Sequence, residues 1–261
     1  MTRLLIALFA LAIPSMAFSE FRTGPVEYKD RDVVLEGYLA LPQGVETKRP
    51  GVLVVPDWMG LKDFDRHIAD KLAAMGYVAF AVDMYGKGVR PANSEQAAAF
   101  ATKYKSNRGL MRERVQAALE TLKKVKIVDE EHIAAIGYCF GGTAVLELAR
   151  SGAPVVGVVS FHGGLETPTP QDAKNIKGKV LALHGADDPF VPPKEVAAFQ
   201  EEMRKGKVDW QMNIYGNAVH SFTNPAAGTD NSKGAAYNEK ADLRSWEAMK
   251  IFFREIFEGQ P

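Results

Sequence analysis

The sequence predicts a doubly wound α/β fold, in which a mostly parallel sheet is flanked by helices on both faces within a single domain. Short apolar segments typical of buried strands alternate with amphipathic segments typical of helices. No internal repeat, low-complexity tract or long linker divides the chain. Its 261 residues are 46% hydrophobic and 25% charged, which is the composition of an ordinary globular protein.

The strands are predicted from two kinds of apolar pattern. Residues 26–41 alternate apolar and polar side chains and are rich in β-branched residues, which predicts two antiparallel strands at a sheet edge. Continuous apolar runs are typical of strands that are covered on both faces. Six such runs predict the central strands: 51–56, 77–82, 132–136, 155–161, 179–184 and 208–214.

The helices are predicted from apolar residues at steps of three and four. One such series begins at Leu61 and ends at Met75, and this spacing places its apolar side chains on one helix face. Longer helical patterns cover 94–126, 140–150, 193–205 and 235–257. Because strands and helices alternate, we expect parallel strands joined by right-handed crossovers.

The amino end has the layout of a secretory signal peptide. Residues 1–19 contain Arg3, a short apolar run, and small residues at Ser15 and Ala17. This pattern predicts cleavage after Ala17, a folded domain over 20–261 and a secreted or periplasmic location. The apolar run is too short to span a bilayer, so no membrane span is expected in the mature form. The alternative for this segment is a buried amino-terminal helix.

Charge and cysteine content exclude several classes of partner and cofactor. The chain has 32 basic and 32 acidic residues, so it lacks the net positive charge of a general nucleic-acid or anionic-membrane binder. Its single cysteine forms no internal disulfide and supplies too few thiolates for a cysteine-based metal site. No H-E-x-x-H spacing occurs. We therefore expect no metal or organic cofactor, and the oligomeric state stays open.

The single cysteine lies in a sequence typical of a nucleophile elbow. Cys139 stands in Gly-Tyr-Cys-Phe-Gly-Gly at 137–142, between a predicted strand and a predicted helix. Glycines suit such a tight turn, because side chains would clash where the strand and the helix approach each other. The helix amino end also favours a thiolate. The alternative is a small buried cysteine without a chemical role.

A base and an acid for this thiol follow two later strands. His220 follows the last predicted strand, while Asp187 and Asp188 follow the strand that ends at His184. The order nucleophile, acid, histidine is the order of α/β-hydrolases. We predict His220 as the base and Asp188 as the acid that orients it, with Asp187 as a turn residue. The histidines His67, His132, His162 and His184 have adequate interpretations as packing or hydrogen-bonding residues.

Five ordered segments of the chain resemble the dienelactone hydrolase family of α/β-hydrolases. They are VVPDWMG at 54–60, AVDMYGKG at 81–88, GYCFGG at 137–142, HGADDPFVP at 184–192 and AVHSF at 218–222. The resemblance implies a triad of Cys139, Asp188 and His220. It also implies an oxyanion hole formed by the backbone N–H groups of Trp58 and Phe140.

Several positions depart from this family. Asp57 stands where members that cleave dienelactone carry a glutamate near the thiol, and it either takes over that role or only caps a turn. Lys87 and Asn224 stand at the positions matched to two carboxylate-binding arginines, and they cannot form a bidentate grip. Tyr85 and Tyr138, with Trp58 and Phe140, suggest an aromatic pocket or else belong to the core.

The expected function is hydrolysis of a small-molecule carboxylic ester or lactone, with Cys139 as the nucleophile that accepts the acyl group. One alternative is a binding or redox-sensing module in which Cys139 is oxidised. Another is hydrolysis of a thioester or a peptide, because the same triad attacks any activated acyl carbon. The segment 217–236 is long enough to be a mobile rim that shapes specificity.

Overall fold

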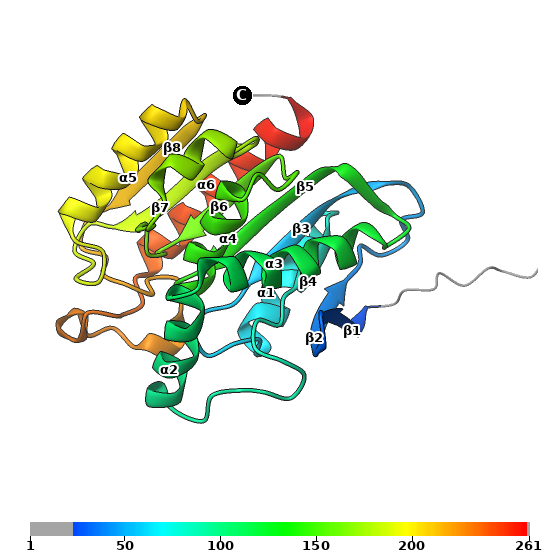
Figure 1. Ribbon diagram of the computed structural model, residues 1–261, viewed down its shortest axis with the longest axis horizontal. Helices are drawn as coiled ribbons and strands as arrows, with labels where there is room; N and C mark the ends of the chain where they lie inside the picture. The colour runs from blue at the N-terminus through cyan, green and yellow to red at the C-terminus, as the bar shows by residue number, and fades with distance from the viewer. Residues whose placement is uncertain (1–22, 260–261) are drawn as a thin grey trace, which may run out of the picture.

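The computed structural model describes residues 23–259, and the predicted signal segment 1–19 lies outside them. An eight-stranded sheet forms the centre of the molecule (Figure 1). Its strands are β1 (Gly24–Asp30), β2 (Val33–Ala40), β3 (Arg49–Val55), β4 (Val78–Ala81), β5 (Val128–Tyr138), β6 (Gly157–Phe161), β7 (Lys179–Gly185) and β8 (Trp210–Tyr215). Each predicted strand is present, with ends that differ by a few residues.

The sheet is mostly parallel, as predicted. Its strand order is β1-β2-β4-β3-β5-β6-β7-β8. The antiparallel pairs are β1 with β2 and β2 with β4, which confirms the antiparallel hairpin at one edge. All pairs from β4 through β8 are parallel. The carboxyl ends of the parallel strands therefore meet at one edge of the sheet, where α/β proteins bind ligands.

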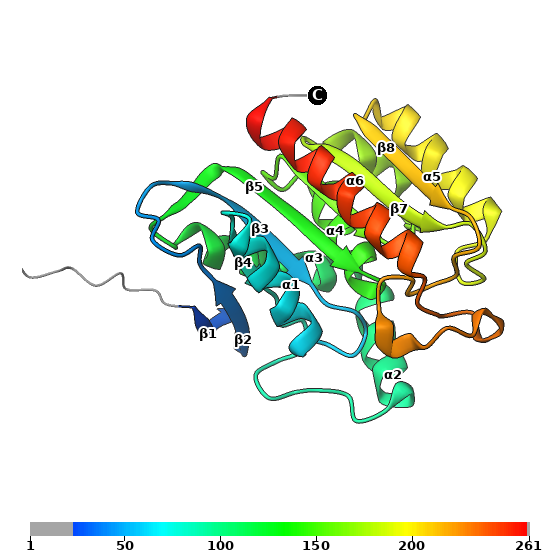
Figure 2. The same cartoon turned by 180° about the vertical axis from the view of Figure 1, so that it is seen from behind.

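Helices cover both faces of this sheet. They are α1 (Asp63–Ala74), α2 (Ser94–Lys105), α3 (Arg108–Lys123), α4 (Phe140–Arg150), α5 (Pro193–Gly206) and α6 (Glu239–Glu258). Helices α3, α4 and α5 lie in front of the sheet in Figure 1, and α1 and α6 lie behind it, facing the viewer in Figure 2. The doubly wound α/β-hydrolase architecture in a single domain is thereby confirmed.

Two hydrophobic clusters fill the space between the sheet and its helices. On one face, Ile68 and Leu72 of α1 and Phe253 of α6 pack on alternate strand residues such as Val54 and Ile136. On the other face, α3, α4 and α5 pack on the intervening residues. Strand side chains alternate between faces, so each central strand contributes to both clusters. This double burial explains why the central strands have nearly continuous apolar sequences.

The predicted helical stretch 94–126 is divided into α2 and α3. The Ser106 hydroxyl donates to the Thr102 carbonyl at 2.7 Å, and the Asn107 side chain accepts from the Leu110 N–H at 3.0 Å. Asparagine is a favoured residue just before a helix, because its side chain satisfies a free N–H of the first turn. The chain therefore ends one helix and begins another within two residues.

Helix α6 begins at Glu239, four residues later than its pattern predicts. Ala235 instead forms a bridge with His220, and the Ala236 N–H donates to the His220 carbonyl at 3.0 Å. Asn238 then caps the helix by accepting from the Ala241 N–H. This bridge holds the segment that follows β8 against the start of α6. Within residues 23–259, the structure has no helix that combines the length and apolarity of a membrane span.

Candidate active site

Cys139 lies at the sharp turn between β5 and α4. It has a φ of 53°, a region that a residue with a side chain rarely adopts. A Cβ on Gly137 would lie 2.1 Å from the Gly141 carbonyl oxygen, and a Cβ on Gly141 would lie 2.1 Å from the Val55 carbonyl oxygen. Both positions therefore require glycine. The predicted elbow is present, and its sulfur is half-buried rather than enclosed in the core.

Three side chains from separate loops meet at this turn. The His220 Nε2 atom lies 3.0 Å from the Cys139 sulfur, and the His220 Nδ1 atom lies 2.8 Å from the Asp188 Oδ2 atom. The second Asp188 oxygen accepts from the Phe190 N–H at 2.8 Å, which orients the carboxylate. Sulfur, imidazole and carboxylate thus form one continuous hydrogen-bonded chain. This is the geometry that nucleophile, base and orienting acid require.

The surroundings of His220 favour its protonated form. Burial by itself would lower the pKa of this imidazole, but the Cys139 sulfur and the Asp188 carboxylate outweigh burial and raise the pKa to about 10. Asp188 is buried, with its side chain shielded from solvent, so its charge acts on His220 with little screening. The imidazole is therefore held as the cationic partner of the sulfur.

The neighbouring aspartate and three of the other histidines lie in other surroundings. Asp187 is exposed on the loop beside buried Asp188. His67 is exposed on α1, and His132 contacts Asp129 near the start of β5. His184 is buried at the end of β7, and burial lowers its pKa. The structure brings only the predicted acid, Asp188, to the imidazole of His220.

The backbone N–H groups predicted for the oxyanion hole lie on two adjoining turns. Phe140 is the first residue of α4, where no preceding helical turn supplies an acceptor for its N–H. Trp58 lies in a turn that is closed by the Gly60 N–H donating to the Asp57 carbonyl at 3.0 Å. The Tyr85 hydroxyl donates to the Trp58 carbonyl at 2.8 Å. Tyr85 thereby holds the orientation of this turn.

Asp57 makes contacts that suit a turn residue. Its Oδ1 atom accepts from the Met59 N–H at 2.8 Å, and its Oδ2 atom accepts from the Lys62 ammonium group at 2.6 Å. Asp65 is fully buried nearby, and burial followed by the Asp57 charge raises its pKa to about 7. The Asp57 carboxylate thus has two partners, and neither of them is the Cys139 sulfur.

Two residues predicted to contact the substrate or the thiol lie elsewhere. Lys87 is paired with Glu27 and Glu36 on the edge hairpin, because its loop lies beside β2. Tyr138 is buried on the opposite face of the sheet from Phe140, where it stacks on Phe161 at 4.7 Å between ring centres. Tyr138 shares its face with the alternate strand residues Ala134 and Ile136, whereas Phe140 lies beyond the turn, in α4. Tyr138 therefore lies in the core, which was its alternative interpretation, and the charge of Lys87 is already paired.

Three other predicted aromatic residues lie in one cluster, and Asn224 caps a turn. Tyr85 and Phe140 pack near each other, with 6.1 Å between ring centres, and Trp58 packs at the margin of the same cluster. The Asn224 side chain accepts from the Ala226 N–H and so caps a short turn. An uncharged capping residue supplies no cation for a carboxylate.

One residue beside Cys139 and His220 is predicted from sequence only as a packing or hydrogen-bonding histidine. His162 follows β6, and its ring lies 5.3 Å from the His220 ring between centres. Its Nδ1 atom accepts from the Cys139 N–H at 3.2 Å, and its Nε2 atom lies 2.8 Å from the Thr223 hydroxyl. The only signal for this in the sequence was its position at the end of a central strand.

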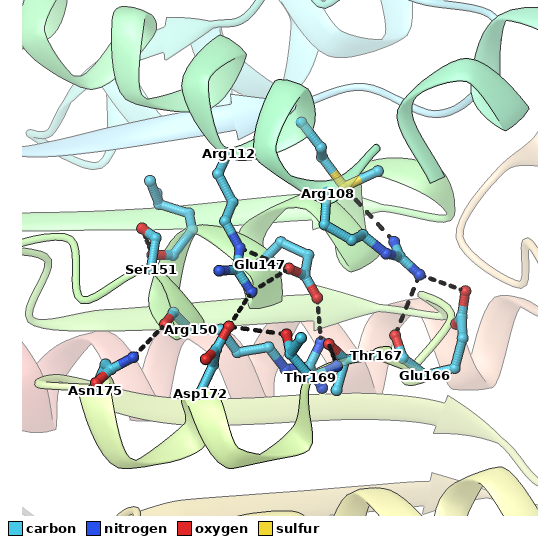
Figure 3. Close-up of polar contacts among 12 residues, drawn as sticks. Arg108, Arg112, Glu147, Arg150, Ser151, Glu166, Thr167, Thr169, Asp172 and Asn175 are labelled. Atoms are coloured by element: carbon cyan, nitrogen blue, oxygen red, sulfur yellow. Dashed lines mark hydrogen bonds and ion pairs between the residues drawn. The ribbon is translucent and has the colours of Figure 1, made fainter. Parts of the chain in front are cut away.

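A buried ionic network supports the helix that follows Cys139. Figure 3 shows Arg150 at the end of α4 bound to Glu147, and Arg112 of α3 reaching both Glu147 and Asp172. Arg150 also binds Glu202 of α5 through two hydrogen bonds of 2.8 Å. The network therefore fixes α4 against α3 and α5.

Comparisons with known proteins identify the family of this chain. The model of the dienelactone hydrolase family matches residues 35–257. A putative carboxymethylenebutenolidase of Aquifex aeolicus is 30% identical over 88% of this chain and 96% of its own. The solved structure named m3DLH has a TM-score of 0.87 and 42% identity over 90% of this chain and 98% of its own.

A second solved structure is the dienelactone hydrolase-like promiscuous phosphotriesterase P91 from metagenomic libraries. It has a TM-score of 0.85 and 41% identity, over 90% of this chain and 98% of its own. The family match spans both the elbow and the loop of His220. The family model and these relatives together support ester or lactone hydrolysis. The chain is a hydrolase that belongs to the dienelactone hydrolase family.

Proposed function

We propose that this protein hydrolyses carboxylic esters or lactones of small molecules through a covalent intermediate on Cys139. The observation that carries the proposal is the hydrogen-bonded chain of Cys139, His220 and Asp188, with distances of 3.0 and 2.8 Å. An imidazole within hydrogen-bond reach of a thiol, itself oriented by a carboxylate, is the arrangement of nucleophilic acyl transfer.

In the first half-reaction, the Cys139 thiolate attacks the carbonyl carbon and forms a tetrahedral oxyanion. The N–H groups of Trp58 and Phe140 stabilise this charge, and each such donor is worth about 3 kcal/mol in comparable sites. His220 enters this step protonated, in keeping with its raised pKa. It then donates its proton to the leaving alkoxide, which departs as an alcohol and leaves a thioester on Cys139.

In the second half-reaction, the same imidazole acts as a base. Once sulfur carries an acyl group it is neutral, so the charge that raised the pKa of His220 most is gone. Burial then favours the neutral imidazole, which takes a proton from water while the hydroxide attacks the thioester. The carboxylic acid departs and the thiolate and imidazolium re-form. One histidine thus serves as acid and base in turn.

The preferred acyl group is a neutral one. Lys87 is already paired with two glutamates, and Asn224 caps a turn, so neither offers a free cation to a substrate carboxylate. We therefore expect neutral activated esters to be cleaved faster than carboxylate-bearing lactones. An aryl phosphotriester should be assayed alongside them, because the relative P91 is described as a promiscuous phosphotriesterase.

The test compares wild type with Cys139→Ala, Cys139→Ser and His220→Ala on p-nitrophenyl acetate. Each substitution should reduce kcat by at least about 10³-fold while the far-ultraviolet spectrum stays unchanged. Mass spectrometry of wild type quenched during turnover should show an acetyl group on Cys139. Substantial activity in Cys139→Ala would contradict the proposal. A peroxide-sensitive change at Cys139 without any acyl adduct would favour redox sensing instead.

Export from the cytoplasm is a further part of the proposal. The signal-like sequence at 1–19 is its support. Cell fractionation followed by amino-terminal sequencing should find the chain outside the cytoplasm, beginning near Phe18. A chain that retains Met1 or Thr2 in the cytoplasm would refute export without affecting the proposed chemistry.

A further inference from the structure

His162 occupies a strained and buried position between the two loops that carry the thiol and its base. It has a φ of 40° and an exposed fraction of 2%. Its N–H donates to the Leu183 carbonyl at 2.8 Å, so its backbone continues the pairing of β6 with β7. A residue with a side chain keeps such a φ only where the surrounding structure enforces it.

The two ring nitrogens of His162 bind two different loops. The Nδ1 atom accepts from the Cys139 N–H at 3.2 Å, an N–H that also donates to the Phe161 carbonyl at 3.0 Å. Because Nδ1 accepts, the neutral ring carries its proton on Nε2, which donates to the Thr223 hydroxyl at 2.8 Å. Thr223 is buried three residues after His220. One side chain thus joins the elbow to the loop of the base.

The surroundings keep His162 neutral. Burial lowers the pKa of this imidazole well below its usual range, and the positive charge of His220 lowers it further. Protonation would also place a second N–H against the Cys139 N–H, where the ring now offers a lone pair. Titratable groups facing the ring include His220 and Tyr138, at 5.3 and 6.1 Å between ring centres.

The ring of His162 also defines where the base can lie. It packs edge to face on the His220 ring, and at 5.0 Å between centres on the Phe222 ring. Asp188 fixes the Nδ1 end of the His220 imidazole, while His162 packs on the ring and limits the movement of the loop that carries His220.

We propose that His162 is a positioning residue that sets the distance between the His220 imidazole and the Cys139 sulfur. It acts as a neutral bridge from the Cys139 N–H to the Thr223 hydroxyl, and it contacts no reacting atom. The inference rests on the proposed cysteine mechanism. A displacement of about 1 Å between reacting groups can reduce a rate about 10²-fold, so a bridge at this place has a direct effect on kcat.

The test uses a matched pair at the far end of the bridge. Thr223→Val keeps the shape of the side chain and removes the hydroxyl that accepts from His162, whereas Thr223→Ser keeps the hydroxyl. We expect Thr223→Val to lower kcat for p-nitrophenyl acetate about tenfold, with KM within about twofold of wild type. The fall in kcat for Thr223→Ser should be several-fold smaller than for Thr223→Val. His162→Phe, which keeps a ring but neither nitrogen, should lose up to about 10²-fold.

A second readout separates positioning from general stability. The pH profile of Cys139 alkylation by iodoacetamide reports on the pair of sulfur and imidazolium. Thr223→Val and His162→Phe should move this profile to higher pH, because His220 no longer lies at bonding distance. His132→Phe is the control for the loss of a histidine, because the His132 ring forms its hydrogen bond with Asp129, at the opposite end of β5.

The outcomes distinguish this inference from the proposed function. If Thr223→Val matches Thr223→Ser in both kcat and alkylation profile, while Cys139→Ala is inactive, the bridge has no positioning role and the cysteine mechanism stands. If Cys139→Ala stays active, the mechanism itself fails. A lower melting temperature with an unchanged alkylation profile would show that His162 only stabilises the fold, which also overturns the inference. Should His162→Phe not fold, the Thr223 pair still decides.

Discussion

Replacing Arg150 by methionine should destabilise the fold strongly. Arg150 is fully buried and makes hydrogen bonds to three groups: Glu147, Glu202 and the Leu165 carbonyl. A methionine side chain has a similar length but carries no hydrogen-bond donor. Glu147 keeps its bond to Arg112, whereas Glu202 loses both hydrogen bonds that Arg150 gave it. The substitution thus leaves one buried carboxylate without a cation.

The size of the loss follows from this unpaired carboxylate. Removing one partner of a buried ion pair costs about 3–5 kcal/mol, a large part of the roughly 5–15 kcal/mol that stabilises a typical domain. For a chain of this size the melting temperature should fall by about 6–20 °C. Lys250→Met is the matched control, because Lys250 pairs with Glu247 on the exposed side of α6. Lys250→Met should lower the unfolding free energy by less than about 1 kcal/mol.

The loss should also depend on pH in a defined direction. Burial raises the pKa of Glu202 even with Arg150 present, and removing the arginine raises it further. A carboxyl group that binds its proton more tightly in the folded state makes the fold less stable as the pH rises above the pKa of the unfolded state, about 4.3. Arg150→Met should therefore lose more stability at pH 8 than at pH 5. Urea unfolding at both values measures this.

The reasoning about Arg150 would be refuted by either of two results. The first is a loss no larger than that of Lys250→Met. The second is a loss that is the same at pH 5 and pH 8, because an unpaired buried carboxylate must respond to protonation. A large loss without pH dependence would indicate that packing around α4, rather than charge, carries the effect.

Three further predictions concern the active site. Tyr85→Phe keeps the ring packing but removes the hydrogen bond to the Trp58 carbonyl, so kcat for p-nitrophenyl acetate should fall about tenfold, less than for loss of a whole oxyanion donor. Gly141→Ala should abolish activity and lower the melting temperature, because its methyl group would lie 2.1 Å from the Val55 carbonyl oxygen. His220, whose pKa is raised to about 10, contributes stability that is present below about pH 6.5 and is lost as the pH rises through 10. The unfolding free energy of wild type relative to His220→Gln should therefore decline between pH 7 and 10.

Each of these predictions has a contrary result. An unchanged kcat in Tyr85→Phe would mean that the Trp58 turn keeps its orientation without the hydroxyl. Full activity in Gly141→Ala would mean that the strand end moves without harm to the site. A constant difference between wild type and His220→Gln from pH 7 to 10 would mean that the imidazole is not held protonated by its neighbours.

The sequence predicts the fold and the elbow well because both depend on local patterns. The apolar runs of the central strands record burial on both faces, and that burial is present. The glycines around Cys139 record a close approach of backbones, which the structure shows at Gly137 and Gly141. Such signals lie within a few residues of the feature they describe, so one sequence suffices to find them.

The surroundings of Lys87 and His162 depend instead on contacts between distant parts of the chain. The family resemblance predicts a substrate contact for Lys87, but its charge is paired with Glu27, 60 residues earlier on the edge hairpin. His162 shows no local pattern either, because its partners Cys139 and Thr223 lie 23 and 61 residues away. No periodicity or spacing records such contacts, so these roles become visible only in three dimensions.

The close approach at Gly141 also bears on the two N–H groups that we propose as oxyanion donors. A Cβ on Gly141 would meet the carbonyl oxygens of Val55 and Pro56, so the first turn of α4 lies directly against the end of β3. That turn carries the Phe140 N–H, and Trp58 follows β3 by three residues. In the proposed mechanism, this one backbone contact sets the spacing of the two donors. Stabilisation of an oxyanion requires donors that are already in place, so under the proposed mechanism the packing of α4 on β3 serves catalysis as well as the core.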